Sequence, residues 1–498
     1  MGNAYFMVVL GIILAKGIGF YRDMVFAGVF GTSVGADIYF QVFGLVNLIF
    51  TGIGMALSTL VIKNINKAHN VGHEKAYAAS FLQKSMLWLI VAAIVMVIFA
   101  GQIVRVILPE ISGENFELAL NMTYVMIPSM AFVVIAYIIS GILQNEKSYF
   151  ITSIMSLPFN AVIIITLMIK GVSVFTVGIV TTIGWFLQIV MMLPQFFKKG
   201  YSFIASKAEL HKEGGKNPEI IWIFISNMMF QLCFYTDRAF VSGDEGMAST
   251  FNYASNLFIT IASVFVVAMS TVVFPSISKN YEEGNIDYVN ELLRYIISVM
   301  VAIFLPFVLV VWLYGEDVIR LIYERGSFDA ESTKAVATMF LIYSLGILGY
   351  VTQELFNKIL YLAGKYKYTV TGTVIVVAIN VIGNILISQN PPEGADVAVV
   401  IASSTSVWLT LYAVAIAFGI RKVVGAYWKK ELVVTILKIL VSGILAYIVY
   451  VIFNTLLPEF THGYISFIVP LGASGVVYAA SLAVSGTLKK LIKRDRKA

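Results

Sequence analysis

The sequence carries little charge and almost no cysteine for its length. Of its 498 residues only 12% are charged, about half the share in an ordinary soluble domain, which excludes a water-soluble enzyme. The single cysteine, Cys233, rules out an intramolecular disulfide and a thiolate metal cluster. The four histidines allow no Ser-His-Asp arrangement, and a G-x-x-x-x-G-K-S/T phosphate loop is missing. Hydrolytic catalysis, ATP hydrolysis and an organic cofactor are therefore not indicated.

Long apolar runs are what the sequence has instead. Hydrophobic residues make up 59% of the chain, and the mean hydropathy is +0.87. The runs have the length of about 20 residues that a helix needs to cross a hydrocarbon core about 30 Å thick. Because they are continuous rather than alternating, they predict helices and not barrel strands. We therefore predict an all-α polytopic membrane protein. Its fourteen candidate spans lie near 4–30, 34–62, 79–108, 120–143, 149–169, 172–197, 219–243, 248–278, 288–314, 333–360, 368–387, 396–419, 431–455 and 463–486.

The charges of the connections indicate how these spans are oriented. Lysine-rich connections, such as the one with Lys63 and Lys75, alternate with acidic ones, such as the one with Glu110 and Glu114. Lysine and arginine are in excess on cytoplasmic loops, so we expect a multi-pass protein with both termini cytoplasmic. The net charge of +6 then reflects topology, and a nucleic-acid partner is not expected.

An internal repeat divides the chain. Residues 56–67 match residues 268–279 at an offset of 212, with identical residues at six of twelve positions. Both segments end the second span of a six-span half, so the halves read as parallel repeats. We predict an N-terminal six-helix lobe at 1–197, a cytoplasmic linker at 198–218, a C-terminal six-helix lobe at 219–420, and two additional helices with a basic tail at 421–498. Two such bundles around a central cavity are typical of alternating-access transporters.

Several segments resemble a known transporter family. Residues 19–37, 141–150, 268–279, 321–329 and 358–361 are similar to those of the MurJ/MviN lipid II flippases, of the multidrug/oligosaccharidyl-lipid/polysaccharide exporter superfamily. The resemblance covers about residues 5 to 420 and implies fourteen spans. It implies transport of an undecaprenyl-pyrophosphate-linked sugar precursor from the inner to the outer leaflet of a bacterial plasma membrane, powered by an ion gradient or membrane potential. It also implies that the last two helices guide the polyprenyl tail.

The cavity arginines of that family are only partly kept here. Lys16 replaces the first and Arg22 retains the second, whereas Phe50 and Asn256 stand where two others are expected. Ionisable groups at such depth face a bundle interior, and a pyrophosphate needs cations. We assign the cargo site to Lys16, Arg22, Asp37, Asn256 and Lys358. The alternatives are structural ion pairs, with Asp23 or Asp37 for Arg22, and a snorkelling side chain for Lys358.

A second set of polar residues indicates an ion site. Asp237 lies near the outer end of the seventh span, Asn380 and Asn384 are spaced i, i+4 on the eleventh, and Thr405 lies on the twelfth. Oxygen donors suit a hard cation, and some members of the family have a sodium site on these helices. Na⁺ or a proton is therefore the expected coupling ion. The alternatives are a salt bridge from Asp237 to Arg238, or asparagines that bond between helices.

These features predict a flippase for lipid II, with a lipid-linked sugar pyrophosphate and membrane lipids as partners, acting as a monomer. The missing arginines favour one alternative, a flippase for a capsule or O-antigen unit. A multidrug cation antiporter of the same superfamily is a more distant alternative. A membrane-embedded glycosyltransferase is not favoured, because the longest outward connection, near 314–333, is too short for a catalytic domain.

Overall fold

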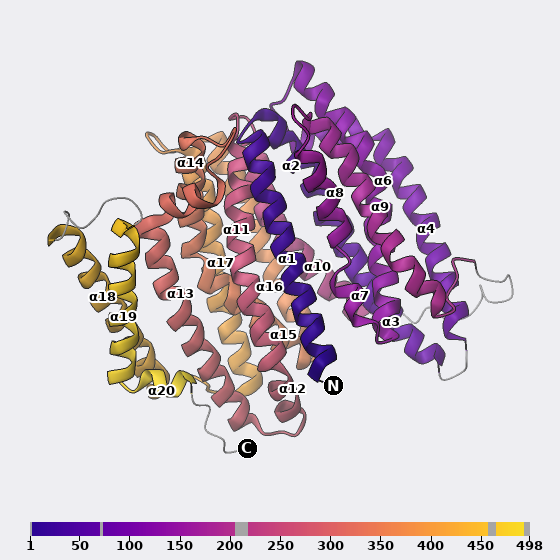
Figure 1. Ribbon diagram of the computed structural model, residues 1–498. Coiled ribbons are helices and arrows are strands. Elements are labelled where there is room, and N and C mark those ends of the chain that lie inside the picture. Colours follow the sequence, from indigo (N-terminus) through magenta and orange to yellow (C-terminus); the bar gives the residue numbers. More distant parts are fainter. Residues whose placement is uncertain (1, 70–72, 205–217, 457–464, 493–498) are drawn as a thin grey trace. The chain divides into compact units, whose positions relative to one another are not determined.

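The computed structural model describes residues 2–69, 73–204, 218–456 and 465–492. Every regular element in these residues is helical: α1 to α20 and one π-helical stretch, η1 (Figure 1). The predicted all-α class is confirmed. The apolar composition explains this class, because in lipid the backbone N–H and C=O groups must be hydrogen-bonded within each helix.

The first six predicted spans all coincide with helices. These are α1 (Gly2–Phe30); α2 (Val34–Val46), η1 (Asn47–Thr51) and α3 (Gly52–His69); α4 (Glu74–Ile98) and α5 (Ala100–Ile107); α6 (Gly113–Asn145); α7 (Tyr149–Ser153) and α8 (Leu157–Leu167); and α9 (Val174–Lys198). Three of the six runs are divided among more than one element, although their apolar composition is continuous.

The later spans follow the same pattern. Their helices are α10 (Pro218–Phe240), α11 (Met247–Val272), α12 (Phe274–Glu282), α13 (Ile286–Tyr323), α14 (Ala330–Leu345), α15 (Ile347–Leu362), α16 (Tyr366–Gln389), α17 (Val397–Val424), α18 (Lys430–Leu456), α19 (Ile465–Val484) and α20 (Thr487–Ile492). Within the described residues, ten helices are long and apolar enough to cross a membrane, or eleven if α14 and α15, bent by 48°, form one span. Fourteen spans are compatible with this result.

The chain forms two compact units, and each is described by itself. The first comprises Met1–Tyr253, Ile322–Val336 and Thr373–Ile401. Its central helix is α6, which contacts α2, α3, α4 and α9. Small residues allow the close approach, as is common between membrane helices: a Cβ at Gly141 of α6 would lie 2.5 Å from the Ser58 hydroxyl of α3.

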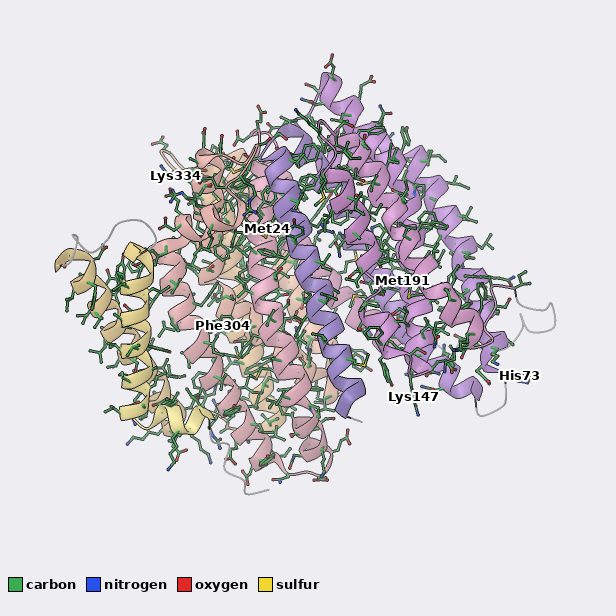
Figure 2. The ribbon with its side chains drawn as sticks, in the orientation of Figure 1. Met24, His73, Lys147, Met191, Phe304 and Lys334 are labelled. Atoms are coloured by element: carbon green, nitrogen blue, oxygen red, sulfur yellow. The ribbon has the colours of Figure 1, made fainter. Side chains whose placement is uncertain are left out.

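The second unit comprises Ala254–Leu321, Ala337–Gly372 and Ala402–Ala498. Phe304 of α13, labelled in Figure 2, is buried there. Its ring meets that of Phe265 of α11 edge to face, with ring centroids 5.2 Å apart. Helices α18 and α19 lie side by side (Figure 1) and pack on α13 through a buried cluster of Ala302, Ile439 and Leu482. These are the two additional helices that the sequence predicts.

The predicted lobe boundaries stay predictions. Of the predicted linker at 198–218, residues 205–217 lie outside the described residues, and so do residues 493–498 of the basic tail.

Candidate functional site

The two cations predicted at the start of the chain both lie on α1, which packs against α7 and α8. Lys16 is exposed, whereas the side chain of Arg22 is only 15% exposed. Six residues of helix place them about 9 Å apart along the axis, on different faces. The two side chains therefore have different surroundings, although the sequence suggests equivalent roles.

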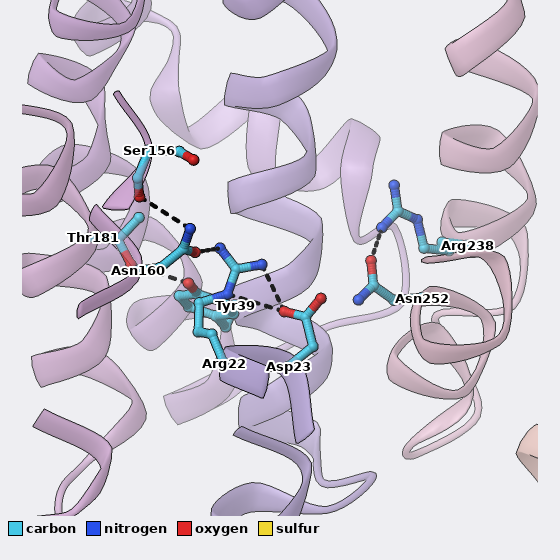
Figure 3. A network of polar contacts seen from close by, with 8 residues as sticks. All are labelled: Arg22, Asp23, Tyr39, Ser156, Asn160, Thr181, Arg238 and Asn252. Atoms are coloured by element: carbon cyan, nitrogen blue, oxygen red, sulfur yellow. Dashed lines mark hydrogen bonds and ion pairs between the residues drawn. The ribbon is translucent and has the colours of Figure 1, made fainter. Parts of the chain in front are cut away.

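Arg22 is held by an ion pair, which Figure 3 shows, and by two aromatic rings. Its Nε and Nη2 donate to Asp23 Oδ1 at 3.0 and 2.6 Å. The guanidinium carbon lies 5.4 Å from the ring centroid of Phe159 and 5.9 Å from that of Phe43, within cation–π range. Of the two acids that the sequence offers as partners, Asp23 is the one that pairs with Arg22.

Asn160 of α8 completes the contacts of Arg22. Its Oδ1 accepts a hydrogen bond from Arg22 Nη1 at 3.1 Å, and its own Nδ2 donates to the Ser156 carbonyl at 3.0 Å. A guanidinium has five N–H donors, and the contacts with Asp23 and Asn160 use three. Within the described residues, two donors remain that could bind an oxyanion. Asn160 is missing from the sequence prediction. The one feature of the sequence that could have pointed to it is that it is a polar residue inside an apolar run.

Asp37 is buried and bonded to backbone amides of another helix. It lies in the first turn of α2 and is 4% exposed. Its Oδ2 accepts from the backbone N–H of Gly246 at 2.7 Å and its Oδ1 from that of Ser249 at 2.6 Å. These amides belong to the N-terminus of α11, where a carboxylate is favoured by the helix dipole. Asp37 thus joins α2 to α11.

At the same end of the first unit, hydrogen bonds to backbone carbonyls join separate segments. The Ser327 N–H donates to the Gly28 carbonyl at 2.8 Å, and the Tyr253 hydroxyl donates to the Gly31 carbonyl at 3.0 Å. Gly31 has a φ of +54°, and a Cβ there would lie 2.3 Å from the Ser327 carbonyl oxygen. Only glycine fits such a position. The loop charges predict that this end of the first unit faces outward.

At this end of the first unit, hydrogen bonding lowers the pKa of an acid that lies outside the predicted spans. The backbone N–H of Ser332 donates to Asp329 Oδ1 at 2.8 Å and lowers the pKa of that carboxyl. The Ser332 hydroxyl lies 2.8 Å from the Thr32 hydroxyl. The connection between α13 and α14 is therefore joined to the connection between α1 and α2 through side chains as well as through the backbone.

The structure brings two of the predicted ion-site residues together. Asn384 Nδ2 of α16 donates to Asp237 Oδ1 of α10 at 2.8 Å, and Asp237, Asn380 and Asn384 are fully buried. Within the described residues, Asn384 Oδ1 accepts no hydrogen bond. A buried carboxylate beside a buried amide oxygen is an arrangement suited to a small cation. Arg238, the other candidate partner of Asp237, bonds to Asn252 Oδ1 (Figure 3).

The remaining predicted residues lie in the second unit. Lys358 of α15 donates from Nζ to the Ser270 hydroxyl of α11 at 2.5 Å, so its ammonium is held by a neighbouring helix. Asn256 of α11 is half-buried, and Thr405 of α17 is 1% exposed. Glu354, one turn before Lys358 on α15, is missing from the sequence prediction; its i, i+4 spacing from Lys358 is the signal that would have found it.

Comparisons with known proteins agree with this architecture. The model of the family described as lipid II flippase MurJ matches residues 26–472. A probable lipid II flippase MurJ of Rhizobium tropici is 24% identical over 424 residues, which cover 81% of this chain and 78% of the relative. A structure of a lipid II flippase MurJ in an inward closed conformation aligns with a TM-score of 0.80 and 20% identity, covering 98% of this chain and 100% of that one. An inward-facing multidrug transporter of the MATE family aligns with a TM-score of 0.70 and 14% identity, covering 84% and 98%. These two structural likenesses show the fold alone.

Proposed function

We propose, since this chain belongs to the lipid II flippase MurJ family, that it moves lipid II from the inner to the outer leaflet of a bacterial inner membrane. The family match over residues 26–472 carries this conclusion. As a transporter of this family the chain serves peptidoglycan biosynthesis. The cargo has a pyrophosphate that must cross a medium of low dielectric, so the protein has to supply positive charge along the path.

Helix α1 is suited to supply that charge. Lys16 is exposed, and Arg22 keeps two N–H donors beyond those bound to Asp23 and Asn160. A guanidinium and an ammonium are the groups that bind phosphates most strongly in proteins. In our proposal Lys16 attracts the pyrophosphate, and Arg22, already oriented by its partners, binds it at a fixed angle.

Lys16→Gln is expected to abolish flipping, and Lys16→Arg to keep most of it, because the charge matters more than the shape. The measurement is flipping of a labelled lipid-linked precursor in reconstituted vesicles. Gly17→Ala is the matched control, because a Cβ there meets no atom within 4 Å. A well-folded Lys16→Gln protein with full activity would remove Lys16 from the cargo site.

The absence of two cavity arginines provides one observation in favour of a second cargo. Phe50 is 5% exposed and Asn256 is neutral, so the two positions expected to carry arginine supply no charge. Such a site would suit a lipid-linked capsule or O-antigen unit with fewer negative groups. Growth of a strain depleted of its lipid II flippase, restored by this chain, supports lipid II; failure with normal expression and folding supports the other cargo.

We also propose that an ion drives transport through Asp237 and Asn384, with Asn380 as a further ligand. The support is the buried Asn384 Oδ1 beside the Asp237 carboxylate. Na⁺ fits this donor set directly, and a proton on Asp237 is the alternative.

Both termini and the connection after α9 are proposed to be cytoplasmic. Ser202 and Glu114 are exposed at opposite predicted sides of the membrane. In a Cys233→Ala background, Glu114→Cys should react with a membrane-impermeant maleimide in intact cells, and Ser202→Cys should react only after permeabilisation. The reverse pattern would invert the topology.

A further inference from the structure

A basic cavity lies in the second unit, and its lining includes none of the site residues discussed above. Its volume is about 230 Å³, and it lies among the first three turns of α18, the turn after α19 and helix α20. Its lining residues are Lys430, Glu431, Val434, Thr435, Lys438, Ser485, Gly486, Thr487 and Lys490. Three ammonium groups against one carboxylate give the lining an excess of positive charge.

The local backbone explains why the lysines converge. Lys438 donates from Nζ to the Ser485 carbonyl at 2.8 Å, just after α19 ends, where a cation is favoured by the helix dipole. Gly486 has a φ of +71° and turns the chain into α20. The Ser485 hydroxyl donates to Thr487 Oγ1 at 2.9 Å and tightens that turn. The turn thereby places Lys490 at the same cavity.

The ammonium groups of this cavity are not paired with carboxylates among the described residues. Among the described residues, Lys430, Lys438 and Lys490 form no ion pair. Glu431 is the one acid in the lining. A group with two acceptor oxygens and a negative charge would therefore meet ammonium donors that the fold leaves available.

An apolar, exposed surface begins directly beside the cavity. Val434 lines the cavity and is 39% exposed, and Leu437 and Val441 continue the exposed apolar face along α18. Trp428 is exposed just before α18, and tryptophan is typical of the membrane interface. A cationic cavity at the end of a lipid-facing surface is the arrangement that recognises a headgroup with its acyl chains.

We propose that this cavity binds the phosphate headgroup of an anionic phospholipid of the leaflet that the loop charges predict to be cytoplasmic. The lysines and the Thr487 hydroxyl bind the phosphate oxygens, and the acyl chains lie along Leu437 and Val441. Because the cavity joins the start of α18 to α20, the bound lipid stabilises the packing of α18, α19 and α20 on α13.

The test compares two double variants of the full chain with equal loss of charge. Lys430→Gln/Lys490→Gln removes two cations from the cavity. Lys422→Gln/Lys429→Gln removes two exposed cations that lie outside the lining, at the same predicted side of the membrane. Phosphatidylglycerol, phosphatidylcholine or inorganic phosphate is added to purified protein in a neutral detergent. Native mass spectrometry then counts bound lipid, and the melting temperature is measured with and without each addition.

Phosphatidylglycerol should bind wild type and the control and raise their melting temperatures, while the cavity variant binds it about tenfold or more weakly. Phosphatidylcholine and inorganic phosphate should have little effect. Both variants should melt like wild type without lipid, since neither change removes a buried contact. Equal phosphatidylglycerol binding by the two variants would overturn the proposal. Protection by inorganic phosphate equal to that by the lipid would overturn the lipid as ligand.

Discussion

Arg22→Met is expected to lower the free energy of unfolding by about 3–5 kcal/mol, because it leaves the Asp23 carboxylate largely buried without its cation. The two side chains are 15% and 14% exposed, so solvent screens the pair only weakly. The substitution also removes the hydrogen bond to Asn160 and the contacts with Phe43 and Phe159. Arg105→Met is the matched control: it removes an exposed arginine that lies over Phe116 and should have little effect.

The double variant Arg22→Met/Asp23→Asn separates the contribution of Arg22 to stability from its contribution to transport. Replacing both members of a buried pair by neutral residues is often nearly neutral for stability, so most of the lost stability should return. Flipping should stay below a tenth of wild type, because the two remaining guanidinium donors are gone. Stability is measured by thermal unfolding in detergent, and flipping in vesicles. If the stable double variant flips cargo normally, Arg22 is a structural residue and not a cargo ligand.

Asp237→Asn is expected to abolish any stabilisation by Na⁺ while leaving the fold intact. An ion that binds only the folded state stabilises it by about 2.7 kcal/mol at a hundred times its dissociation constant. The wild-type melting temperature should therefore rise with Na⁺ at fixed ionic strength, and that of the variant should not. Without Na⁺ the variant should melt close to wild type, because an asparagine oxygen at this position can still accept the hydrogen bond from Asn384 Nδ2.

Thr236→Val is the control for this experiment. Its hydroxyl donates to the carbonyls of Leu232 and Cys233 in its own helix, so the substitution changes a neighbour of Asp237 and keeps the Asp237 and Asn384 side chains. It should respond to Na⁺ like wild type. A wild-type protein whose stability depends on pH but not on Na⁺ would identify a proton as the coupling ion. A response to neither ion would remove Asp237 from the coupling site.

Sequence reasoning located the helices well because their cause is local. An apolar run of sufficient length is helical wherever it lies in the membrane, and each of the fourteen runs coincides with helix. The breaks inside the runs were not predicted, such as those at Phe99 and Gly346, because the composition does not change there. Where a run bends depends on packing against other helices, which composition does not encode.

The contacts of the site residues also differ in whether the sequence can predict them. Asp237 and Asn384 could be matched from depth and spacing, because both are polar residues in otherwise apolar spans. Asp37 could not be matched, because its partners are the backbone amides of Gly246 and Ser249, and every residue except proline has such an amide. Asn160 lies 138 residues from Arg22, and a contact at that separation is visible only in the folded chain.

The packing of α18 and α19 on α13 sets an order for biogenesis. The Tyr478 hydroxyl bonds to the Ala302 carbonyl, 176 residues earlier in the chain, and a Cβ at Gly443 would lie 2.9 Å from Leu305. During synthesis this face of α13 therefore enters the bilayer long before its partners are translated, and lipid must cover it in the interval. The packing of α13 with α18 and α19 forms only when these two helices displace that lipid, so this step must wait until Tyr478 has been translated.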